Sequence, residues 1–453
     1  MELKGKNALV IGAGISGFAA AKVAQKFGAN VVLSDAKTED KIEGDLKSLR
    51  DMGINLVFGE QKEELLRNID LVILSPAVPV KIPLIQAAYK QNIPVTTEIE
   101  LAYNFAQSPI AAVTGTNGKT TTTTLLGELL KAHYDKVGVG GNIGVPLVDE
   151  ALRVGENGAI AAEISSYQME ATNHFRPKVA AILNVTPDHL KRHGSMEVYQ
   201  EMKEKLFAEE TEDDFVVLNY DDERARGMAS RTKAKVYYFS RREKFNNGAF
   251  LAGDILTISD NGNLNPLLTI SELGIKGGHN VENALAAAMS AYLMGVSADE
   301  MIPVLRKFKG VEHRIEFVRE INGVKYYNDS KATNTDSAIK ALETFDSHII
   351  LIAGGDDKGT DLTEFMTLAK ERSDALILVG DAAERFKKAA LDIGFDEKSV
   401  YMAGYDMEKA LSIAKDMAIA PQIVLLSPAC ASFDMYKNFE ERGKDFKRIV
   451  NDF

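Results

Sequence analysis

The sequence predicts an α/β protein of three domains, each built around a doubly wound, largely parallel sheet. The prediction depends on three sets of short apolar runs that alternate with helical patterns along 453 residues. Strands that are separated by helices pair in parallel, because a parallel connection needs a crossover. A chain of this length with 45% hydrophobic residues suffices for about three domains, which we expect at residues 1–97, 98–311 and 312–453.

The first set of strands lies in the first hundred residues. Its apolar runs are 7–11, 30–34, 55–58, 71–74 and 94–96. Gly12-Ala-Gly-Ile-Ser16-Gly17 joins the first strand to the first helix, and Asp35 ends the second strand. Glycines at this point let a diphosphate approach a helix N-terminus, and the acid suits a ribose hydroxyl. NAD, another nucleotide diphosphate and a tight structural turn all fit this pattern, so the loop alone does not choose among them.

The second set opens on a loop built to hold phosphate. An apolar run at 109–113 is followed by Gly115-Thr-Asn-Gly118-Lys119-Thr120 and a helical pattern. Position 113, where the longer Walker pattern has a glycine, carries Val113, so the match is to a shortened form. The glycines turn backbone N–H groups inward, Lys119 supplies charge for β and γ phosphates, and the Thr120 hydroxyl can bind Mg²⁺. The loop therefore predicts a nucleoside triphosphate site.

The remaining elements complete the second sheet and build the third. Strands are expected at 158–163, 179–185 and 215–218, and short strands with the turn Asp260-Asn-Gly262 predict a β-hairpin excursion between 236 and 270. Helical sequence runs from His279 to about Lys307. The third set has strands at 349–352, 375–379 and 423–426.

Polar residues follow the strands of the second set. Glu163 ends a strand at the carboxyl edge of the sheet, where it can share Mg²⁺ with Thr120 or simply cap the next helix. His189 follows the next strand and suits a metal, a phosphate or a structural role. Lys203 lies in a charged helical pattern, so helix physics alone predicts that it faces solvent.

Asn280 and Asn283 lie one turn apart at the start of a helix. Their amides suit an adenine edge, and helix capping explains them equally well.

Composition excludes several classes of protein. A net charge of −12 argues against a nucleic-acid partner, because phosphate backbones require basic surfaces. The single cysteine, Cys430, excludes a disulfide framework and a four-cysteine zinc site, and it favours a reducing cytoplasm. No apolar run is long enough to span a bilayer, and the first residues pass directly into a strand instead of a signal peptide.

The motifs together resemble those of the bacterial Mur ligases over essentially the whole chain, and in particular the members that add D-glutamate. The shared motifs are Gly115 to Thr120, Gly140-Gly-Asn-Ile-Gly144, Glu163-Ile-Ser-Ser166, Asn184 to His189, Gly278-His-Asn-x-x-Asn283, His313-Arg314, Asn328 to Asn334, Gly354-Gly-Asp-Asp-Lys358 and Ser427 to Asp434. The resemblance implies a Rossmann-like N-terminal domain for a UDP sugar, a P-loop ATPase-like central domain and a Rossmann-like C-terminal domain for D-glutamate.

The resemblance also implies roles for individual residues. Catalytic roles would fall to Lys119, Glu163, His189 and Lys203, with Lys203 carbamylated. Metal binding, to two Mg²⁺ ions, would involve Thr120, Glu163, His189 and Lys203. The residues implied for ATP are Gly115, Thr116, Asn117, Gly118, Lys119, Thr120, Thr121, Asn283, Arg314 and Asp329. Those implied for the UDP substrate are Ser16, Asp35 and Asn142, and those for D-glutamate are Thr333, Lys358, Ser432, Phe433 and Phe439.

The implied activity is ATP-dependent amide formation between UDP-N-acetylmuramoyl-L-alanine and D-glutamate through an acyl phosphate, in peptidoglycan precursor synthesis, by a cytoplasmic monomer. Two local features strain the pattern: Asp357 stands where relatives carry a smaller residue, and Lys205 lies close to Lys203.

Two other functions remain as alternatives. An NAD-linked dehydrogenase would use the loop at Gly12 but leaves the loop at Lys119 unexplained. A non-catalytic sensor of UDP sugars and ATP would bind both nucleotides without joining anything.

Overall fold

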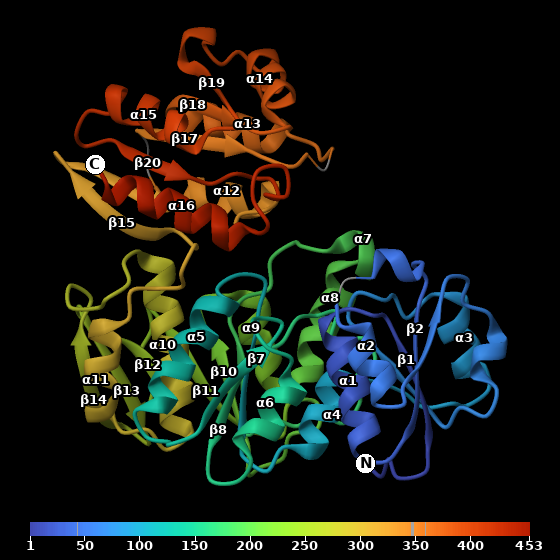
Figure 1. The fold of residues 1–453 in the computed structure, drawn as a ribbon. Coiled ribbons are helices and arrows are strands. Elements are labelled where there is room, and N and C mark those ends of the chain that lie inside the picture. The colour runs from blue at the N-terminus through green and yellow to red at the C-terminus, as the bar shows by residue number, and fades with distance from the viewer. Residues whose placement is uncertain (43, 346–347, 358) are drawn as a thin grey trace. The chain divides into compact units, whose positions relative to one another are not determined.

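The computed structural model describes residues 1–42, 44–345, 348–357 and 359–453. The chain divides into two compact units, Met1–Phe308 and Lys309–Phe453 (Figure 1). The first unit contains two sheets and the second contains one, in agreement with the three predicted sets of strands. No helix among the described residues has the length and apolar character needed to cross a bilayer.

The first sheet has five parallel strands in the order β3-β2-β1-β4-β5. Its strands are β1 Asn7–Ile11, β2 Asn30–Asp35, β3 Asn55–Phe58, β4 Leu71–Leu74 and β5 Val95–Thr97. Its helices are α1 Ile15–Lys26, α2 Leu46–Asp51, α3 Pro83–Lys90 and α4 Glu98–Phe105, with 3₁₀ turns η1 Glu39–Lys41 and η2 Glu63–Leu66. The strand order reverses between β1 and β4, and ligands of such sheets bind at that point.

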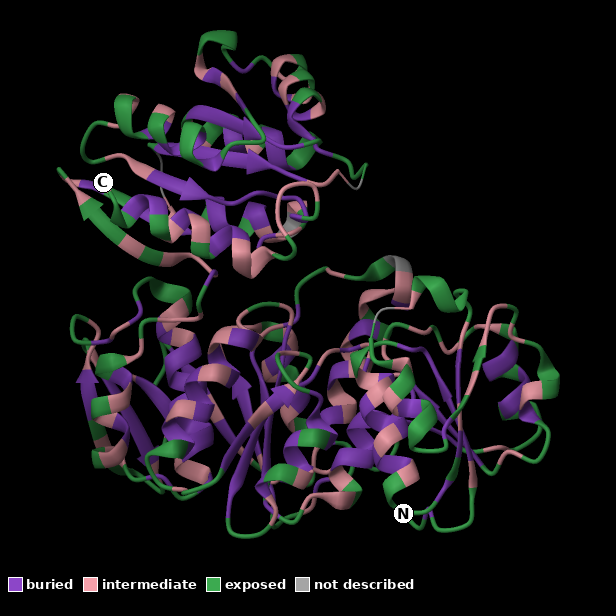
Figure 2. Cartoon of the chain, in the orientation of Figure 1, coloured by how far each residue is buried: buried purple, intermediate pink, exposed green. Residues whose placement is uncertain are grey.

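The second sheet has nine strands in the order β14-β13-β12-β11-β10-β9-β6-β8-β7. They are β6 Ile110–Thr114, β7 Val137–Gly141, β8 Ala159–Glu163, β9 Val179–Ile182, β10 Phe215–Asn219, β11 Lys235–Ser240, β12 Gly248–Ala252, β13 Ile255–Asp260 and β14 Asn263–Thr269. The β13–β14 pair is the predicted hairpin, and Asn261 and Gly262 both have positive φ at its turn. Strand β8 is buried throughout (Figure 2), as expected for a parallel strand covered on both faces.

Helices cover both faces of this sheet. They are α5 Lys119–Lys131, α6 Leu147–Val154, α7 Leu190–His193, α8 Met196–Glu204, α9 Glu223–Gly227, α10 Gly278–Leu293 and α11 Ala298–Lys307, with η3 Lys205–Phe207 and η4 Met228–Arg231. Apolar residues of α5, α10 and α11 share one core with one face of the sheet. The other face shares a continuous core with the first sheet, which explains why the two sheets form one unit.

The second unit is a six-stranded sheet in the order β15-β16-β20-β17-β18-β19, with β15 antiparallel and the others parallel. The strands are β15 Glu316–Ile321, β16 Val324–Asn328, β17 Ile349–Gly354, β18 Ser373–Val379, β19 Val400–Gly404 and β20 Ile423–Leu426. The helices are α12 Thr335–Glu343, α13 Thr363–Arg372, α14 Ala383–Asp392, α15 Met407–Met417 and α16 Phe439–Asn451, with η5 Glu397–Ser399. Two apolar cores lie on its two faces.

Two predicted elements differ from the observed ones. The helix expected from His279 to Lys307 is two helices, α10 and α11, because the chain turns at Gly295 with φ of +98° and Ser297 then caps α11. The strand expected at 179–185 ends at Ile182, after which Asn184 folds onto the neighbouring phosphate loop.

Candidate active site

The phosphate loop, residues 115–120, joins β6 to α5 in a conformation that only glycine permits at two positions. Gly118 has φ of +84°, and a Cβ there would lie 2.4 Å from Asn283 Oδ1. Gly115 has φ of +157°, and a Cβ there would lie 2.9 Å from Leu183 Cβ. Larger residues would therefore displace the loop from the N-terminus of α5, where helix polarity favours anions.

Lys119 folds back over this loop. Its Nζ donates to the carbonyl oxygens of Gly115 and Thr116, each at 2.9 Å. Thr120 and Thr121 follow in the first turn of α5, and Thr120 is buried. The ammonium thus lies at the mouth of a loop of backbone donors, which is the arrangement that phosphate binding requires.

Asn184 fixes the opposite side of the loop, a role that the sequence did not reveal. Its Oδ1 accepts hydrogen bonds from the backbone N–H groups of Thr116 at 3.0 Å and Asn117 at 2.8 Å. The Thr116 hydroxyl lies 3.2 Å from the Tyr199 hydroxyl and donates to the Thr186 carbonyl at 3.1 Å. The available signal was position: an amide directly after a strand that neighbours β6 reaches the same sheet edge.

Glu163 lies beside the phosphate loop because β8 pairs with β6 in a register that sets Glu163 opposite Val113. Its side chain is buried, and Oε1 accepts a hydrogen bond from Asn142 Nδ2 at 2.8 Å. The other oxygen, Oε2, is buried without a hydrogen-bond partner among the residues described. A buried carboxylate oxygen left in this state fits a hard cation such as Mg²⁺.

Lys203 contradicts the expectation that it faces solvent. It is 1% exposed, and its Nζ lies 4.3 Å from the centre of the Tyr199 ring. Burial, together with the nearby Lys119 ammonium, holds the pKa of Lys203 well below its usual range, and Asp188 only partly opposes this. The helix buries this lysine because Tyr199, one turn earlier, directs the same face toward the phosphate loop.

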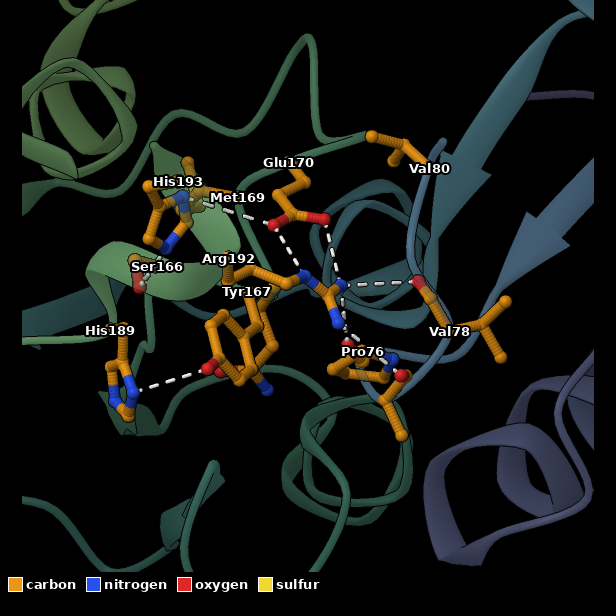
Figure 3. Close-up of polar contacts among 12 residues, drawn as sticks. Pro76, Val78, Val80, Ser166, Tyr167, Met169, Glu170, His189, Arg192 and His193 are labelled. Carbon is orange, nitrogen blue, oxygen red and sulfur yellow. Dashed lines mark hydrogen bonds and ion pairs between the residues drawn. The ribbon is translucent and has the colours of Figure 1, made fainter. Parts of the chain in front are cut away.

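His189 lies at the start of α7 with φ of +53°, and its side chain is 46% exposed. Its Nδ1 lies 3.1 Å from the Tyr167 hydroxyl (Figure 3), and its Nε2 lies 3.3 Å from Asp188 Oδ2. In the described part of the chain, no group of three or more His, Cys, Asp and Glu residues is placed to hold a metal ion. A cation here would therefore draw further ligands from Thr120, a modified lysine or substrate phosphates.

The first glycine loop, residues 12–17, lies at the switch point between β1 and β4. Gly12 has φ of +100°, and a Cβ on Gly17 would lie 1.8 Å from the Gly12 carbonyl oxygen. Asp35 braces the loop, accepting the Ala13 N–H at 2.8 Å and the Lys37 N–H at 2.9 Å. Ser16 stands in the first turn of α1, half-buried. The loop thus offers a helix N-terminus and glycine backbone, as the pattern predicts.

Asn283, whose amide suits either contact with an adenine edge or capping of α10, packs against the phosphate loop. Its Oδ1 accepts a hydrogen bond from the Thr122 hydroxyl at 3.2 Å, and its Nδ2 donates to Asn280 Oδ1 at 3.1 Å. The Asn283 side-chain amide therefore packs against Gly118 and stabilises the phosphate loop.

The second unit collects a separate set of predicted residues. Asp329 is buried after β16, where its carboxylate accepts the Ile315 N–H at 3.1 Å and the Ser427 hydroxyl at 2.8 Å. Burial raises the pKa of Asp329 to about 7, although Ser427 and the nearby Arg314 oppose the shift. Thr333 is half-buried in the loop that follows.

The residues predicted for D-glutamate differ in exposure. Ser432 is buried, Phe433 is 71% exposed, and Phe439 is the first residue of α16. Lys358 lies outside the described residues. Asp357, the local departure noted in the sequence, forms two hydrogen bonds with Arg385, at 2.7 and 2.6 Å, and these fix the chain before position 358.

Arg442 of α16 is a buried residue that belongs to none of the sequence motifs. It is 1% exposed and donates to Ser330 Oγ at 2.9 Å, Ser330 O at 2.9 Å, Ala431 O at 3.0 Å and Cys430 O at 3.0 Å. It therefore joins the loop after β16 to the loop after β20, which carries Ser432. An arginine in an amphipathic helix gives no sequence signal of burial, since most such residues face solvent.

Family models match nearly the whole chain. They are the Mur ligase MurD-like N-terminal domain at residues 6–97, the Mur ligase middle domain at 113–291 and the Mur ligase glutamate ligase domain at 313–430.

Curated relatives match from end to end. A Thermoanaerobacter sp. (strain X514) protein named UDP-N-acetylmuramoylalanine--D-glutamate ligase is 46% identical over 450 residues, covering 99% of each chain. Proteins of the same name from Pelotomaculum thermopropionicum and Clostridioides difficile are 47% identical over 445 residues and 42% identical over 455 residues, with at least 97% of every chain covered.

Solved structures share the fold. UDP-N-acetylmuramate-alanine ligase MurC from Thermotoga maritima gives a TM-score of 0.56 at 20% identity, over 99% of both chains. MurF from Acinetobacter baumannii gives 0.59 at 18% identity, over 97% of this chain and 93% of that one. The predicted three-domain α/β class is therefore confirmed. With end-to-end relatives at these identities, the chain belongs to the Mur ligase family.

Proposed function

We propose that the chain is an ATP-dependent ligase that joins D-glutamate to UDP-N-acetylmuramoyl-L-alanine, a step of peptidoglycan precursor synthesis. The observation that carries the proposal is the phosphate loop with Lys119, flanked by the buried Glu163 and Lys203. Relatives that carry this activity in their names match the chain from end to end, which supports the choice of substrates.

Amide formation from a carboxylate needs prior activation, because the carboxylate oxygen would have to depart as oxide, which is a poor leaving group. The alanyl carboxylate attacks the γ-phosphorus of ATP, which forms an acyl phosphate and releases ADP. The amine of D-glutamate then attacks the acyl carbon, and phosphate leaves the tetrahedral intermediate as the amine loses its proton. Phosphoryl transfer depends mainly on positioning and on charge neutralisation.

The phosphate loop serves the first of these steps. Backbone N–H groups from Gly115 to Thr121 and the Lys119 ammonium would hold the ATP phosphates. Asn283 would contact the base, and Arg314 and Asp329 of the second unit would contact phosphate and ribose. Lys119 therefore has to leave its own loop carbonyls and turn to the nucleotide when ATP binds.

Magnesium would be held by Thr120, Glu163, His189 and a carbamylated Lys203, as two ions. Bound there, Mg²⁺ neutralises phosphate charge and orients the transferred group. Lys203 suits this modification because only a neutral amine reacts with CO₂, and burial beside Lys119 favours the neutral form. The carbamate converts a buried amine into an anionic oxygen ligand, which replaces the repulsion between Lys203 and Lys119 by attraction.

The substrates to be joined would lie at the sheet edges. Ser16 and Asp35 would contact the UDP group, and Asn142, hydrogen-bonded to Glu163, would lie between the sugar and the metal. Thr333, Lys358, Ser432, Phe433 and Phe439 would surround D-glutamate, whose two carboxylates suit a cation and a hydroxyl.

We further propose domain borders at 97/98 and 311/312, small-molecule substrates without nucleic acid, and a monomer that acts in the cytoplasm.

One assay tests the proposal. The purified protein is incubated with ATP, Mg²⁺, UDP-N-acetylmuramoyl-L-alanine and D-glutamate, while phosphate release and product mass are followed. We expect phosphate release that depends on both acceptor substrates and a product with one added glutamyl residue. Phosphate release without that dependence, or binding of both nucleotides without a new amide, would contradict the ligase and favour a sensor.

A further inference from the structure

Arg192 of α7 joins the two sheets of the first unit. Its Nε and Nη2 donate to the two carboxylate oxygens of Glu170, each at 2.8 Å (Figure 3). Nη2 also donates to the carbonyls of Val78 at 3.2 Å and Pro76 at 3.3 Å, and Nη1 donates to that of Ala77 at 3.4 Å. The Arg192 side chain is 17% exposed, so most of it is shielded from water.

The three carbonyls belong to the β4 loop, residues 75–80, which lies beside the first glycine loop. A Cβ on Gly12 would lie 2.7 Å from Ser75 Cβ and 2.9 Å from Val78 Cγ2, and the Ser75 N–H donates to the Ile11 carbonyl at 2.9 Å. Together the two loops form the switch-point crevice of the first sheet, where ligands of this architecture bind. Arg192 therefore determines where one wall of that crevice lies.

On its other side, Arg192 supports the residue that orients His189. The guanidinium carbon lies 4.5 Å from the centre of the Tyr167 ring, and the Tyr167 hydroxyl lies 3.1 Å from His189 Nδ1. Tyr167 thus stands between the guanidinium and the imidazole (Figure 3). Arg192 therefore contacts both the β4 loop, which is one wall of the switch-point crevice, and Tyr167, the partner of the predicted metal ligand His189.

The chemistry of the contact requires arginine. Five N–H donors in a planar fork can pair with both oxygens of Glu170, reach neighbouring carbonyls and still stack on an aromatic ring. A lysine at this position has one ammonium with three donors and cannot make the bidentate pair and the stacking contact together. Without Arg192, the carbonyls of residues 76–78 have no other hydrogen-bond donor among the residues described, so the β4 loop is held less firmly and keeps its bonds at residues 75 and 78–80.

We propose that Arg192 is a positioning residue that couples the UDP-sugar crevice to the His189 turn. The nature of the ligand in the crevice rests on the proposed function. The coupling itself rests on the contacts of Arg192 with Glu170, Tyr167 and the β4 loop.

The test compares Arg192→Ala and Arg192→Lys with a matched control, Arg231→Ala. Arg231 also forms a bidentate pair, with Glu204 at 2.9 and 2.6 Å, in the same unit but away from the β4 loop. Calorimetry with UDP-N-acetylmuramoyl-L-alanine gives Kd without turnover, and steady-state assays give KM for each substrate and the Mg²⁺ concentration for half-maximal rate.

For Arg192→Ala we expect Kd and KM for the UDP substrate to rise about tenfold, which corresponds to about 1.4 kcal/mol. The Mg²⁺ concentration for half-maximal rate should rise with them, while KM for D-glutamate stays near wild type. The melting temperature should fall, because the Glu170 carboxylate, only 9% exposed, loses its partner. Arg192→Lys should lie between wild type and Arg192→Ala, and Arg231→Ala should match wild type. Glu170→Ala combined with Arg192→Ala should raise Kd for the UDP substrate no further than Arg192→Ala alone, because the hydrogen bonds of the Glu170 carboxylate go to the guanidinium and the next basic side chain, His193, lies 3.9 Å away.

A Kd for Arg192→Ala within twofold of wild type overturns the inference, as does an equal rise in KM for the UDP substrate and D-glutamate. If Arg192→Ala does not fold, Arg192→Lys decides: a Kd raised threefold or more supports the coupling, and a Kd within twofold refutes it. Wild-type protein that binds the UDP substrate without forming an amide contradicts the proposed function but leaves this binding comparison intact.

Discussion

Replacing Lys203 by alanine tests the chemical state of a buried amine. An ordinary lysine, with a pKa of about 10.4, is neutral in roughly one molecule in 2,500 at pH 7, and each unit of lowering raises that fraction about tenfold. Lys203 is 1% exposed, lies near Lys119 and has a pKa well below the usual range. The fraction of neutral amine that CO₂ can attack is therefore larger for Lys203 than for a solvated lysine.

We expect Lys203→Ala to lose at least about a hundredfold in kcat, since loss of a metal ligand or its support costs on the order of 10–100-fold or more. Short carboxylic acids added in millimolar amounts should restore part of the activity, because they return an oxygen anion to the space that the side chain leaves. The assay is initial rate of phosphate release against concentration of formate or acetate, with saturating substrates.

Lys205→Ala is the matched control, because Lys205 lies two residues further along the same segment. Its Nζ donates to the carbonyls of Met169 at 3.0 Å, Glu170 at 3.1 Å and Thr172 at 3.4 Å, so its role is to tie chain segments together. Any loss of activity in that variant should not respond to carboxylic acids. Full activity in Lys203→Ala, or equal rescue of both variants, would refute the carbamate.

Three further predictions follow from contacts in the two units. Asn184→Ala should raise Kd for ATP about tenfold with little effect on Kd for the UDP substrate, because it removes the acceptor of two phosphate-loop N–H groups, at about 1 kcal/mol or less each. Calorimetry with each ligand checks this. Asp329 has a folded pKa raised to about 7, so the folded chain binds more protons than the unfolded chain between about pH 4 and 7, and stability falls as pH rises through this window. Asp329→Asn should flatten that fall in melting temperature between pH 5 and 8, and an unchanged slope would contradict the shift. Arg442→Met should lower the melting temperature and raise KM for D-glutamate, because the carbonyls of Ser330 and Cys430 lose their donor and that of Ala431 keeps only the Asp356 N–H; an unchanged melting temperature would refute its structural role.

The sequence predicted those parts of the fold and site that depend on local patterns. Apolar runs predicted most of the strands but not β7, β15, β16 and β19. The glycines at 12 and 118 predicted tight loops, because a side chain there would meet both an unfavourable backbone angle and a neighbouring atom. Glu163 could be placed beside the phosphate loop from strand order alone, since carboxyl ends of parallel strands share an edge. The break between α10 and α11 was missed because apolar periodicity continues across Gly295.

What the sequence could not predict are the long polar side chains whose partners come from distant segments. Arg192 and Arg442 occur in charged helical patterns that normally face solvent, and only the fold brings carbonyl groups 112 and 116 residues away against their guanidinium groups. Lys203 is also buried by the fold, but its neighbours are the Tyr199 ring and the Lys119 ammonium, and the Asp188 carboxylate only partly compensates. Burial and Lys119 therefore disfavour its charge. Arg192 and Arg442 find acceptors for several N–H donors, whereas no hydrogen-bond acceptor for Lys203 lies among the residues that the structure describes, and that difference separates a structural cation from a candidate for modification.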